Sequence, residues 1–320
     1  MYLDYPWIGR VYLCLHSLVL LMKQHSYSFF CGYLAGERRR LRAAETALAA
    51  TAGCDADALA AAEDVEFHRA SLTSASGRVV YPANVTYRNF FDYMMFPTVV
   101  YELEYPRRDA INWRYFGTKV AATLGVFFLM IVLAEQFFYA RVMHALSLRE
   151  LPLAVRAVEY PYVLLDLMFP FIVMYLLTWY IIWDAILNAV AEATRFADRS
   201  FYGDWWNSVR WDQFAREWNT PVHLFLLRHV YHSSISAFQL SRPAATIMTF
   251  LLSSVVHELV MFVIFRKLRG YLLLLQMCQL PLVWVSKRRW LAHRRTLGNV
   301  FFWFGIYTGP SLMCSLYLVF

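Results

Sequence analysis

Four stretches of this 320-residue chain are long and apolar enough to cross a lipid bilayer as single helices. A spanning helix needs about 20 mostly apolar residues, because its backbone must hydrogen-bond within itself inside the hydrocarbon. The four stretches are Phe116–Ala140, Tyr162–Val190, Ala244–Phe265 and Asn299–Phe320. Lipid excludes open sheet edges, so the sequence predicts an all-α, polytopic membrane protein.

Two weaker stretches raise the expected number of spans to about six. Val11–Leu34 is interrupted by Lys23-Gln24-His25, and Gly270–Val285 is only 16 residues long. The last strong stretch contains Gly309-Pro310, which we expect to bend the helix without ending it. Leu224–Leu240 is apolar but carries Arg228 and two histidines, so we expect it to be buried or to lie in the membrane interface.

Composition excludes several other classes of protein. Hydrophobic residues make up 59% of the chain and charged residues 17%, against about 45–50% and 25% in soluble domains. The cysteines have no C-x-x-C spacing, so we expect neither a metal site nor a disulfide scaffold; they are Cys14, Cys31, Cys54, Cys278 and Cys314. The net charge is +7 without a contiguous basic face, so nucleic acid is not an expected partner. Met1–Arg10 does not resemble a signal peptide.

The distribution of basic residues predicts which gaps between spans face the cytosol. Gaps 36–115, 194–243 and 286–298 together hold 21 Lys and Arg, whereas gaps 141–161 and 266–269 hold six. Cytosolic loops are enriched in these residues, so we expect the first three gaps in the cytosol. Residues 1–320 are predicted to form one domain, with 36–115 and 194–243 as its cytosolic loops. Within the first loop, Ala43–Arg69 is predicted to be helical and solvated, and Ser71–Gly77 to be a loop.

Several catalytic motifs are missing from the sequence. It contains no G-x-x-x-x-G-K-[ST], G-x-G-x-x-G or G-x-S-x-G, so nucleotide hydrolysis, dinucleotide redox chemistry and a hydrolase elbow lack support. His257-Glu258 begins like H-E-x-x-H, but Met261 occupies the second histidine position, which excludes that zinc motif.

His257 lies in the middle of an apolar span, where an ionisable side chain is costly and indicates function. We expect burial to favour the neutral imidazole, which is the form that accepts a proton. Ser253 shares its helix face and can orient the ring or contact a ligand. Glu258 points about 100° away, toward a neighbouring helix. A purely structural histidine in an interhelical hydrogen bond remains an equal alternative.

A second feature mixes aromatic rings with polar groups in the gap 194–243. Phe201-Tyr202-Gly203-Asp204-Trp205-Trp206-Asn207 is followed by Arg216, Asn219, His223 and Tyr231. Flat rings interleaved with donors and acceptors suit a ligand that carries a nucleotide, phosphates and an amide-rich arm. An interfacial belt of Trp and Tyr is an equally good reading of the composition.

The run Phe201–Asn207 resembles the F-Y-x-D-W-W-N signature of the acyl-CoA-dependent membrane-bound O-acyltransferases, a branch of sterol and diacylglycerol acyltransferases. As in that family, an intramembrane histidine follows about fifty residues later. Four further segments resemble the sterol O-acyltransferases, and the fungal enzymes most closely: Met22–Tyr27, Asn89–Thr98, Tyr101–Arg107 and Ser253–Glu258. The resemblance covers Val11 to Phe320.

The resemblance implies transfer of a long-chain acyl group from acyl-CoA to the 3β-hydroxyl of a sterol. It implies that His257 is the catalytic histidine, that Asn219 is its partner, and that the signature run serves acyl-CoA use. It also implies the family's helical bundle, homo-oligomers and the endoplasmic reticulum membrane. Such enzymes have a longer N-terminal part, so we expect this chain to lack the family's first spans.

The residue chemistry agrees with these roles. A neutral His257 can take the hydroxyl proton, which supplies roughly 10²–10⁴-fold in rate. An amide such as Asn219 can stabilise the developing oxyanion by about 2.7–4 kcal/mol. Beside the signature run, Arg216, His223, Tyr231 and Ser253 are candidate contacts for acyl-CoA, the charged co-substrate.

We expect direct transfer without a resident cofactor, because only Ser253 is placed to form an acyl-enzyme. A diacylglycerol acyltransferase is the alternative of the same chemistry. A transporter whose path is lined by His257 and Glu258 is the alternative of another class, and the absence of an inverted repeat disfavours it.

Overall fold

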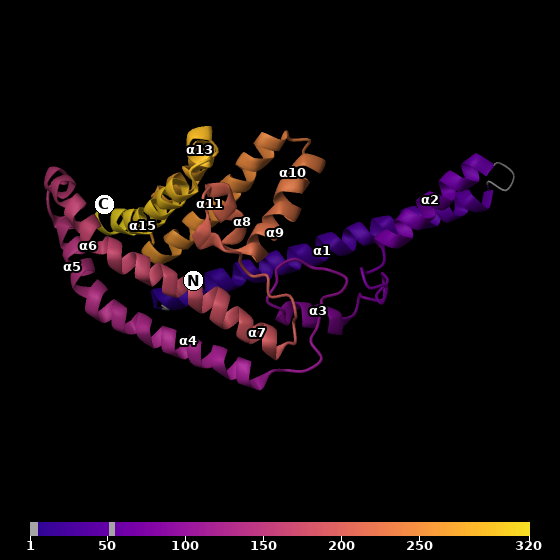
Figure 1. Ribbon diagram of the computed structural model, residues 1–320, viewed down its shortest axis with the longest axis horizontal. Helices are drawn as coiled ribbons and strands as arrows, with labels where there is room; N and C mark the ends of the chain where they lie inside the picture. Colours follow the sequence, from indigo (N-terminus) through magenta and orange to yellow (C-terminus); the bar gives the residue numbers. More distant parts are fainter. Residues whose placement is uncertain (1–5, 51–54) are drawn as a thin grey trace. The chain divides into compact units, whose positions relative to one another are not determined.

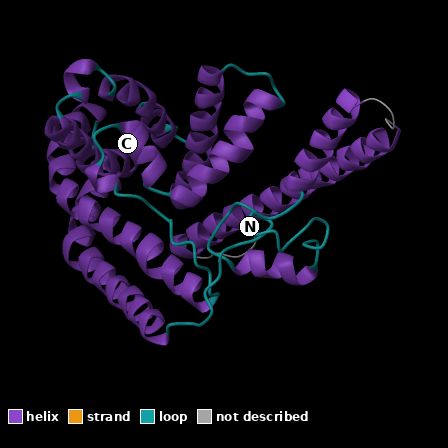
Figure 2. Cartoon of the chain, turned by 45° about the vertical axis from the view of Figure 1, so that its right-hand side comes forward, coloured by secondary structure: helices purple, strands orange, loops and turns teal. Residues whose placement is uncertain are grey.

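The computed structural model describes residues 6–50 and 55–320, and helices dominate that part of the chain (Figure 1, Figure 2). Within these ranges the only β-structure consists of isolated bridges between Thr73 and Val80 and between Arg107 and Phe196. The prediction of an all-α protein is therefore confirmed. Cys54, part of the Ala-rich segment and the first half of Met1–Arg10 lie outside the described residues.

Helical elements follow one another with short connections. In chain order they are α1 (Trp7–Ala50), α2 (Asp55–Ser71), α3 (Tyr87–Met95), α4 (Trp113–Leu133), η1 (Ala134–Phe138), α5 (Tyr139–Ser147), η2 (Leu148–Glu150), α6 (Leu153–Trp179), η3 (Tyr180–Ile186), α7 (Leu187–Ala193), η4 (Trp205–Asn207), α8 (Trp211–Glu217), α9 (Thr220–Phe225), η5 (Leu226–His232), α10 (Ser233–Ser236), α11 (Arg242–Phe265), α12 (Tyr271–Met277), α13 (Gln279–Ser286), α14 (Arg289–Ala292) and α15 (Arg295–Val319). η1, η3 and η5 are π-helical and continue the α-helices on either side.

Four helical stretches are long and apolar enough to cross a membrane. They are Trp113–Glu150, Leu153–Ala193, Arg242–Phe265 and Arg295–Val319. They coincide with the four strong stretches in the sequence, and the protein is a multi-pass membrane protein as predicted. Pro310 lies inside α15, so the prediction that Gly309-Pro310 does not end the helix is confirmed.

The two weaker stretches do not form long apolar helices, so the count of about six spans is not met by length and composition. Val11–Leu34 is part of the 44-residue α1, in which Lys23 is buried among polar groups and whose later turns are charged. Gly270–Val285 forms the short pair α12 and α13, an apolar helical stretch over Tyr271–Ser286. At 1.5 Å per residue it is about 24 Å long, less than the roughly 30 Å of hydrocarbon.

The chain forms two compact units, and the four apolar stretches belong to the first. This unit comprises Asn112–Glu192, Arg199–Phe320 and the N-terminal residues through His16. In it, α15 packs along α6 and α4 packs against η3 (Figure 1). One core cluster surrounds Trp205, and another joins α5 and α6 to the end of α15.

The second unit comprises Ser17–Ile111 and Ala193–Asp198. α2 runs back along the C-terminal half of α1, where the buried Glu37 pairs with Arg40 and with His68 Nδ1 at 2.7 Å. Most side chains of the Ala-rich segment are exposed, so the prediction of a solvated helical segment is confirmed for the residues described.

Lys23 anchors the other end of this unit. Its buried ammonium donates to the carbonyl oxygens of Tyr93 at 2.9 Å, Met94 at 3.2 Å and Phe96 at 2.6 Å, at the C-terminal end of α3. A cation is favourable there because the last carbonyls of a helix have no partners within the helix.

Candidate active site

His257 lies on α11, and its imidazole has a defined orientation. Nδ1 is 2.7 Å from the carbonyl oxygen of Ser253, one turn earlier. A carbonyl oxygen only accepts, so Nδ1 carries the hydrogen and Nε2 of the neutral ring is left as the acceptor. Protein atoms leave the side chain exposed within the span, so the burial by protein that we expected is not found. It is the backbone of Ser253, not its hydroxyl, that orients the ring.

Asn219 caps the N-terminus of α9. Its Oδ1 accepts from the backbone N–H of Val222 at 3.2 Å, which satisfies one of the free donors of the first turn. A backbone N–H only donates, so this contact fixes which end of the amide is the oxygen. The Nδ2 group is left as a donor, and in the described part of the chain it has no hydrogen-bond partner.

A helical hairpin brings Asn219 and His257 to matching heights. The continuous helix from Thr220 to Ser236 is followed by a short turn and then by α11, which packs against η5 and α10 (Figure 1, Figure 2). Thr220 and His257 are each about 15 residues, or roughly 23 Å, from their end of that turn. No hydrogen bond joins the two side chains among the residues described here, so an open acceptor and an open donor remain at one level.

The signature run is partly core and partly surface. Phe201 and Trp205 are each 2% exposed, and Trp205 packs with Trp179, Trp211 and other rings in the core. Asp204, Trp206 and Asn207, which belong to the run, are exposed. The sequence offered a belt or a ligand site as alternatives, and the burial shows that two of the four rings in the run belong to the core.

The backbone of the signature run is clamped to the segment that contains Asn219. Gly203 N–H donates to the carbonyl of Glu217 at 2.8 Å, and Thr220 N–H donates to the carbonyl of Phe201 at 3.0 Å. A Cβ at Gly203 would lie 2.9 Å from Glu217 Cγ, so the variable position of the signature is occupied here by a residue without a side chain. The run therefore fixes where α9 begins.

Arg216 is tied to an acidic partner. It donates to Asp212 at 3.1 Å, and Asp212 also contacts Arg210 at 3.3 Å and Lys287 at 3.4 Å. Burial raises the pKa of Asp212, but the Arg216 hydrogen bond and the three positive charges outweigh it and hold that pKa below its usual value. As a contact for phosphate, Arg216 is thus partly neutralised.

His223 and Tyr231 lie on the hairpin arm that begins at Asn219. His223 is half-buried, and burial followed by the charge of Arg216 lowers its pKa. Its ring is therefore neutral near pH 7. Tyr231 is half-buried in η5 and meets the ring of His232 edge to face at 5.3 Å.

Glu258 stabilises the turn between α11 and α12 and is not part of the site. It is buried, and its carboxylate accepts from Gly270 N–H at 2.7 Å, Leu273 N–H at 3.1 Å and Tyr317 OH at 2.6 Å. The prediction that it serves a neighbouring helix is confirmed, because these groups belong to the start of α12 and to α15.

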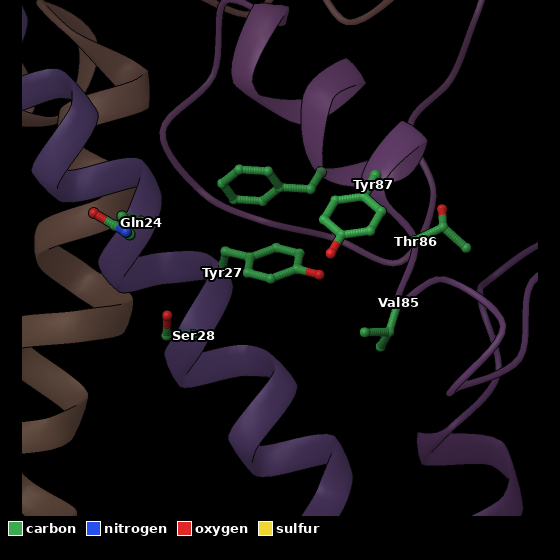
Figure 3. A pocket seen from close by; sticks show the side chains of 7 residues that line it. Gln24, Tyr27, Ser28, Val85, Thr86 and Tyr87 are labelled. Atoms are coloured by element: carbon green, nitrogen blue, oxygen red, sulfur yellow. The ribbon is translucent and has the colours of Figure 1, made fainter.

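A pocket of about 550 Å³ lies in the second unit, and none of the predicted site residues lines it. Its walls are aromatic, with Gln24 and Ser28 on α1 as polar rim groups (Figure 3). Tyr27 and Phe90 meet edge to face at 4.9 Å, and Tyr87 is almost fully exposed at the mouth.

The model of the MBOAT, membrane-bound O-acyltransferase family, matches residues 6–319. This chain belongs to that family. Among its relatives, sterol O-acyltransferase 2 of Saccharomyces cerevisiae is 49% identical over 98% of this chain and 50% of its own length. Sterol O-acyltransferase 2 of Candida albicans is 42% identical over 99% of this chain and 58% of its own length. Diacylglycerol O-acyltransferase 1 of Dictyostelium discoideum is 34% identical over 74% of this chain and 38% of its own length. The chain spans about half the length of the two sterol O-acyltransferases.

One polar cluster beside the signature run of this acyltransferase-family chain was missed from the sequence. Asp184 accepts from Tyr202 OH at 2.8 Å and pairs with Lys119 at 2.6 Å, which joins η3 and α4 to the run. Both charged residues lie inside strong apolar stretches, where ionisable groups indicate function. The sequence did contain this signal: Lys119 and Asp184 are ionisable residues inside apolar stretches, the same criterion that selected His257.

Proposed function

We propose that this chain carries the acyl-transfer site of a sterol O-acyltransferase, which moves a long-chain acyl group from acyl-CoA to a sterol 3β-hydroxyl. Most directly, this is supported by an open acceptor, Nε2 of His257, and an open donor, Nδ2 of Asn219, at similar heights by residue count on the two arms of one hairpin. Acyl transfer to an alcohol requires a base for the hydroxyl proton and a donor for the oxyanion.

The proposed reaction is a direct transfer. Nε2 of His257 takes the proton while the sterol oxygen attacks the thioester carbon, and Asn219 Nδ2–H donates to the carbonyl oxygen as it becomes negative. The tetrahedral species then expels the CoA sulfur, and the imidazolium returns the proton to it. One C–O bond forms and one C–S bond breaks, without a resident cofactor. Ser253 has no nucleophilic part in this scheme, because the acyl group passes directly to the sterol oxygen; its backbone carbonyl orients the base.

Acyl-CoA is the proposed water-borne co-substrate on the side of the signature run. The exposed Asp204, Trp206 and Asn207 are available to it, whereas Phe201 and Trp205 support the run from the core. His223 and Tyr231 follow Asn219 along the same arm, and Arg216 precedes it. We propose these groups as its contacts, with Tyr202 held in place by Asp184.

A sterol is favoured over diacylglycerol as acceptor, because the sterol O-acyltransferases are both more similar and matched over more of this chain. We further propose the endoplasmic reticulum membrane as location, a homo-oligomer as assembly, and membrane lipid but not nucleic acid as partner. The family match favours acyl transfer over the transport alternative.

The test is ester formation in a background that makes none. Microsomes are prepared from Saccharomyces cerevisiae lacking both of its sterol O-acyltransferases and carrying this chain joined to the N-terminal half of the relative. Labelled oleoyl-CoA is supplied with either ergosterol or diacylglycerol. We expect labelled steryl ester, and we expect His257→Ala to abolish it at an unchanged protein level.

Each alternative gives a different result. Labelled triacylglycerol in place of steryl ester would show that the acceptor is diacylglycerol and not a sterol. Neither ester, with the protein present at normal level, would overturn acyl transfer. Activity retained in His257→Ala would remove the base. Asp198→Asn is the control, because Asp198 is an exposed titratable residue in gap 194–243 and has no proposed role in transfer.

A further inference from the structure

The segment between α13 and α15 carries a surface that acyl transfer does not explain. We call it the basic-aromatic patch and define it by seven residues: Trp284, Lys287, Arg288, Arg289, Trp290, Arg294 and Arg295. All seven are exposed, and the two tryptophans are each 60% exposed. No acidic residue occurs in the sequence from Ser286 to Val300. The patch therefore presents one sign of charge.

The patch is held in shape by the protein. Leu291, in the middle of the patch, is 2% exposed, and its buried side chain anchors the short helix α14 to the protein. The guanidinium of Arg288 lies 3.3 Å from the ring centroid of Trp284, a stacked cation–π contact. Lys287 reaches Asp212 at 3.4 Å. The remaining arginines, Arg289, Arg294 and Arg295, are exposed beside this packed segment.

Three of the arginines have no counter-charge within the protein. In the described ranges, Arg289, Arg294 and Arg295 form no ion pair. Arg294 and Arg295 also begin α15, whose first turn contains no acidic residue. Positive charge is unfavourable beside the positive end of a helix dipole, so the protein itself does not stabilise this arrangement. An anion from outside the protein would stabilise these positive charges.

The position of the patch identifies the anion. It lies where two apolar segments, α13 and α15, meet, and exposed tryptophan is typical of the headgroup level of a bilayer. Basic clusters at the end of a membrane helix attract anionic lipid. We propose that the basic-aromatic patch binds the headgroups of anionic phospholipids in the adjoining leaflet, with Trp284 and Trp290 at the interface and Arg289, Arg294 and Arg295 on the phosphates.

The test measures which lipids the protein retains. The full chain is reconstituted in nanodiscs of dioleoylphosphatidylcholine with 20% dioleoylphosphatidylserine, extracted in mild detergent, washed, and analysed for bound lipid by mass spectrometry. We expect several-fold enrichment of phosphatidylserine over its share in the nanodisc. The variant R289Q/R294Q/R295Q should lose most of this enrichment, and R289K/R294K/R295K should keep it, because the attraction depends on charge.

The matched control removes the same charge elsewhere. R38Q/R39Q/R42Q changes three arginines on α1 that have no proposed role in transfer and should leave the enrichment intact. Equal loss in both triple variants would overturn the patch as a specific site, as would no enrichment in the wild type. If R289Q/R294Q/R295Q retains as much phosphatidylserine as the wild type but has a higher KM for oleoyl-CoA in pure phosphatidylcholine, the patch binds the phosphates of acyl-CoA instead. That result would overturn the proposal. A melting temperature measured for each variant separates lost lipid from lost fold.

Discussion

Asn219 uses the two ends of its amide for different purposes, and this separates its structural role from its proposed chemical one. Oδ1 caps α9 through Val222 N–H, and Nδ2 is left to donate. An aspartate keeps the acceptor and loses the donor, whereas an alanine loses both. The pair of substitutions therefore distinguishes stability from turnover.

We expect Asn219→Asp to keep the melting temperature of the wild type and to lower kcat by about 10²–10³-fold, the effect of one oxyanion donor. Asn219→Ala should show the same loss of turnover and, in addition, a loss of about 0.5–2 kcal/mol from the missing cap. Thermal unfolding in detergent and the steryl ester assay provide the two measurements. An Asn219→Asp variant as active as wild type would leave the amide with a capping role alone.

Asp212 makes part of the stability pH-dependent. Contacts with Arg210, Arg216 and Lys287 hold its pKa below the usual 3.8 in the folded protein. A carboxyl with a lowered folded pKa adds stability above its unfolded pKa and loses it as the pH falls through the folded value. The wild type should therefore melt higher than Asp212→Asn at pH 6–7.

The gap between the two melting temperatures should narrow steadily below about pH 4, where the carboxyl becomes protonated. Melting curves between pH 3 and 7 in one detergent measure it. A gap that stays constant across this range would show that Asp212 stabilises by packing and not by charge. Arg216→Gln is the partner variant and should reduce the same slope only in part.

At the scale of elements, α15 can approach α8 closely because Gly305 has no side chain. A Cβ at this position would overlap Trp211, at Cζ2 and Cη2 of its indole. Trp211 is buried in the core with Phe214 and Phe302, so it cannot move aside. Gly305→Ala should cost about 1–3 kcal/mol, the usual penalty for overpacking.

Gly309→Ala is the matched control for this prediction. It lies one turn later on the same helix, and a Cβ there meets nothing within 4 Å apart from its chain neighbours. We expect its melting temperature to fall less than that of Gly305→Ala, because the better helix propensity of alanine offsets the contact between its Cβ and the ring of Pro310. Equal losses in both variants would mean that α15 is sensitive to any change and that the contact with Trp211 is not special.

The same elements show what a sequence can reveal about a membrane protein. Apolar length identified the four spans, because lipid allows little besides a helix. It did not place Tyr271–Ser286, whose length is below that of a full span and whose path depends on contacts made elsewhere. Nor did it identify the clamp between Gly203 and Glu217, because that contact depends on the arrangement of loops. His257 and the signature run were visible because their residue types are unusual in their surroundings.

At the scale of the whole chain, contacts within the first unit restrict its path through the membrane. Asn299 Nδ2 and Trp303 Nε1 both donate to the carbonyl of Trp206 at 3.0 Å, and Lys287 reaches Asp212. Gaps 194–243 and 286–298 therefore contact each other, and two segments in contact outside the spans belong on one side of the membrane; that this side is the cytosol stays a prediction. Since α11 leaves that side, Tyr271–Ser286 must bring the chain back despite being only about 24 Å long. A thinned bilayer or helices shielded by protein accommodate a short segment of this kind.

Thiol labelling tests this path. In a variant whose native cysteines are replaced, we introduce Phe238→Cys, His293→Cys or Lys267→Cys, each at an exposed position in a different connection. An impermeant maleimide added to sealed microsomes should label the first two, because the count of basic residues predicts that both face the cytosol. Lys267→Cys should react only after detergent opens the vesicles. Labelling of Lys267→Cys in sealed vesicles would mean that α11 does not cross completely, and the level assigned to His257 would then lie near one surface instead of within the membrane.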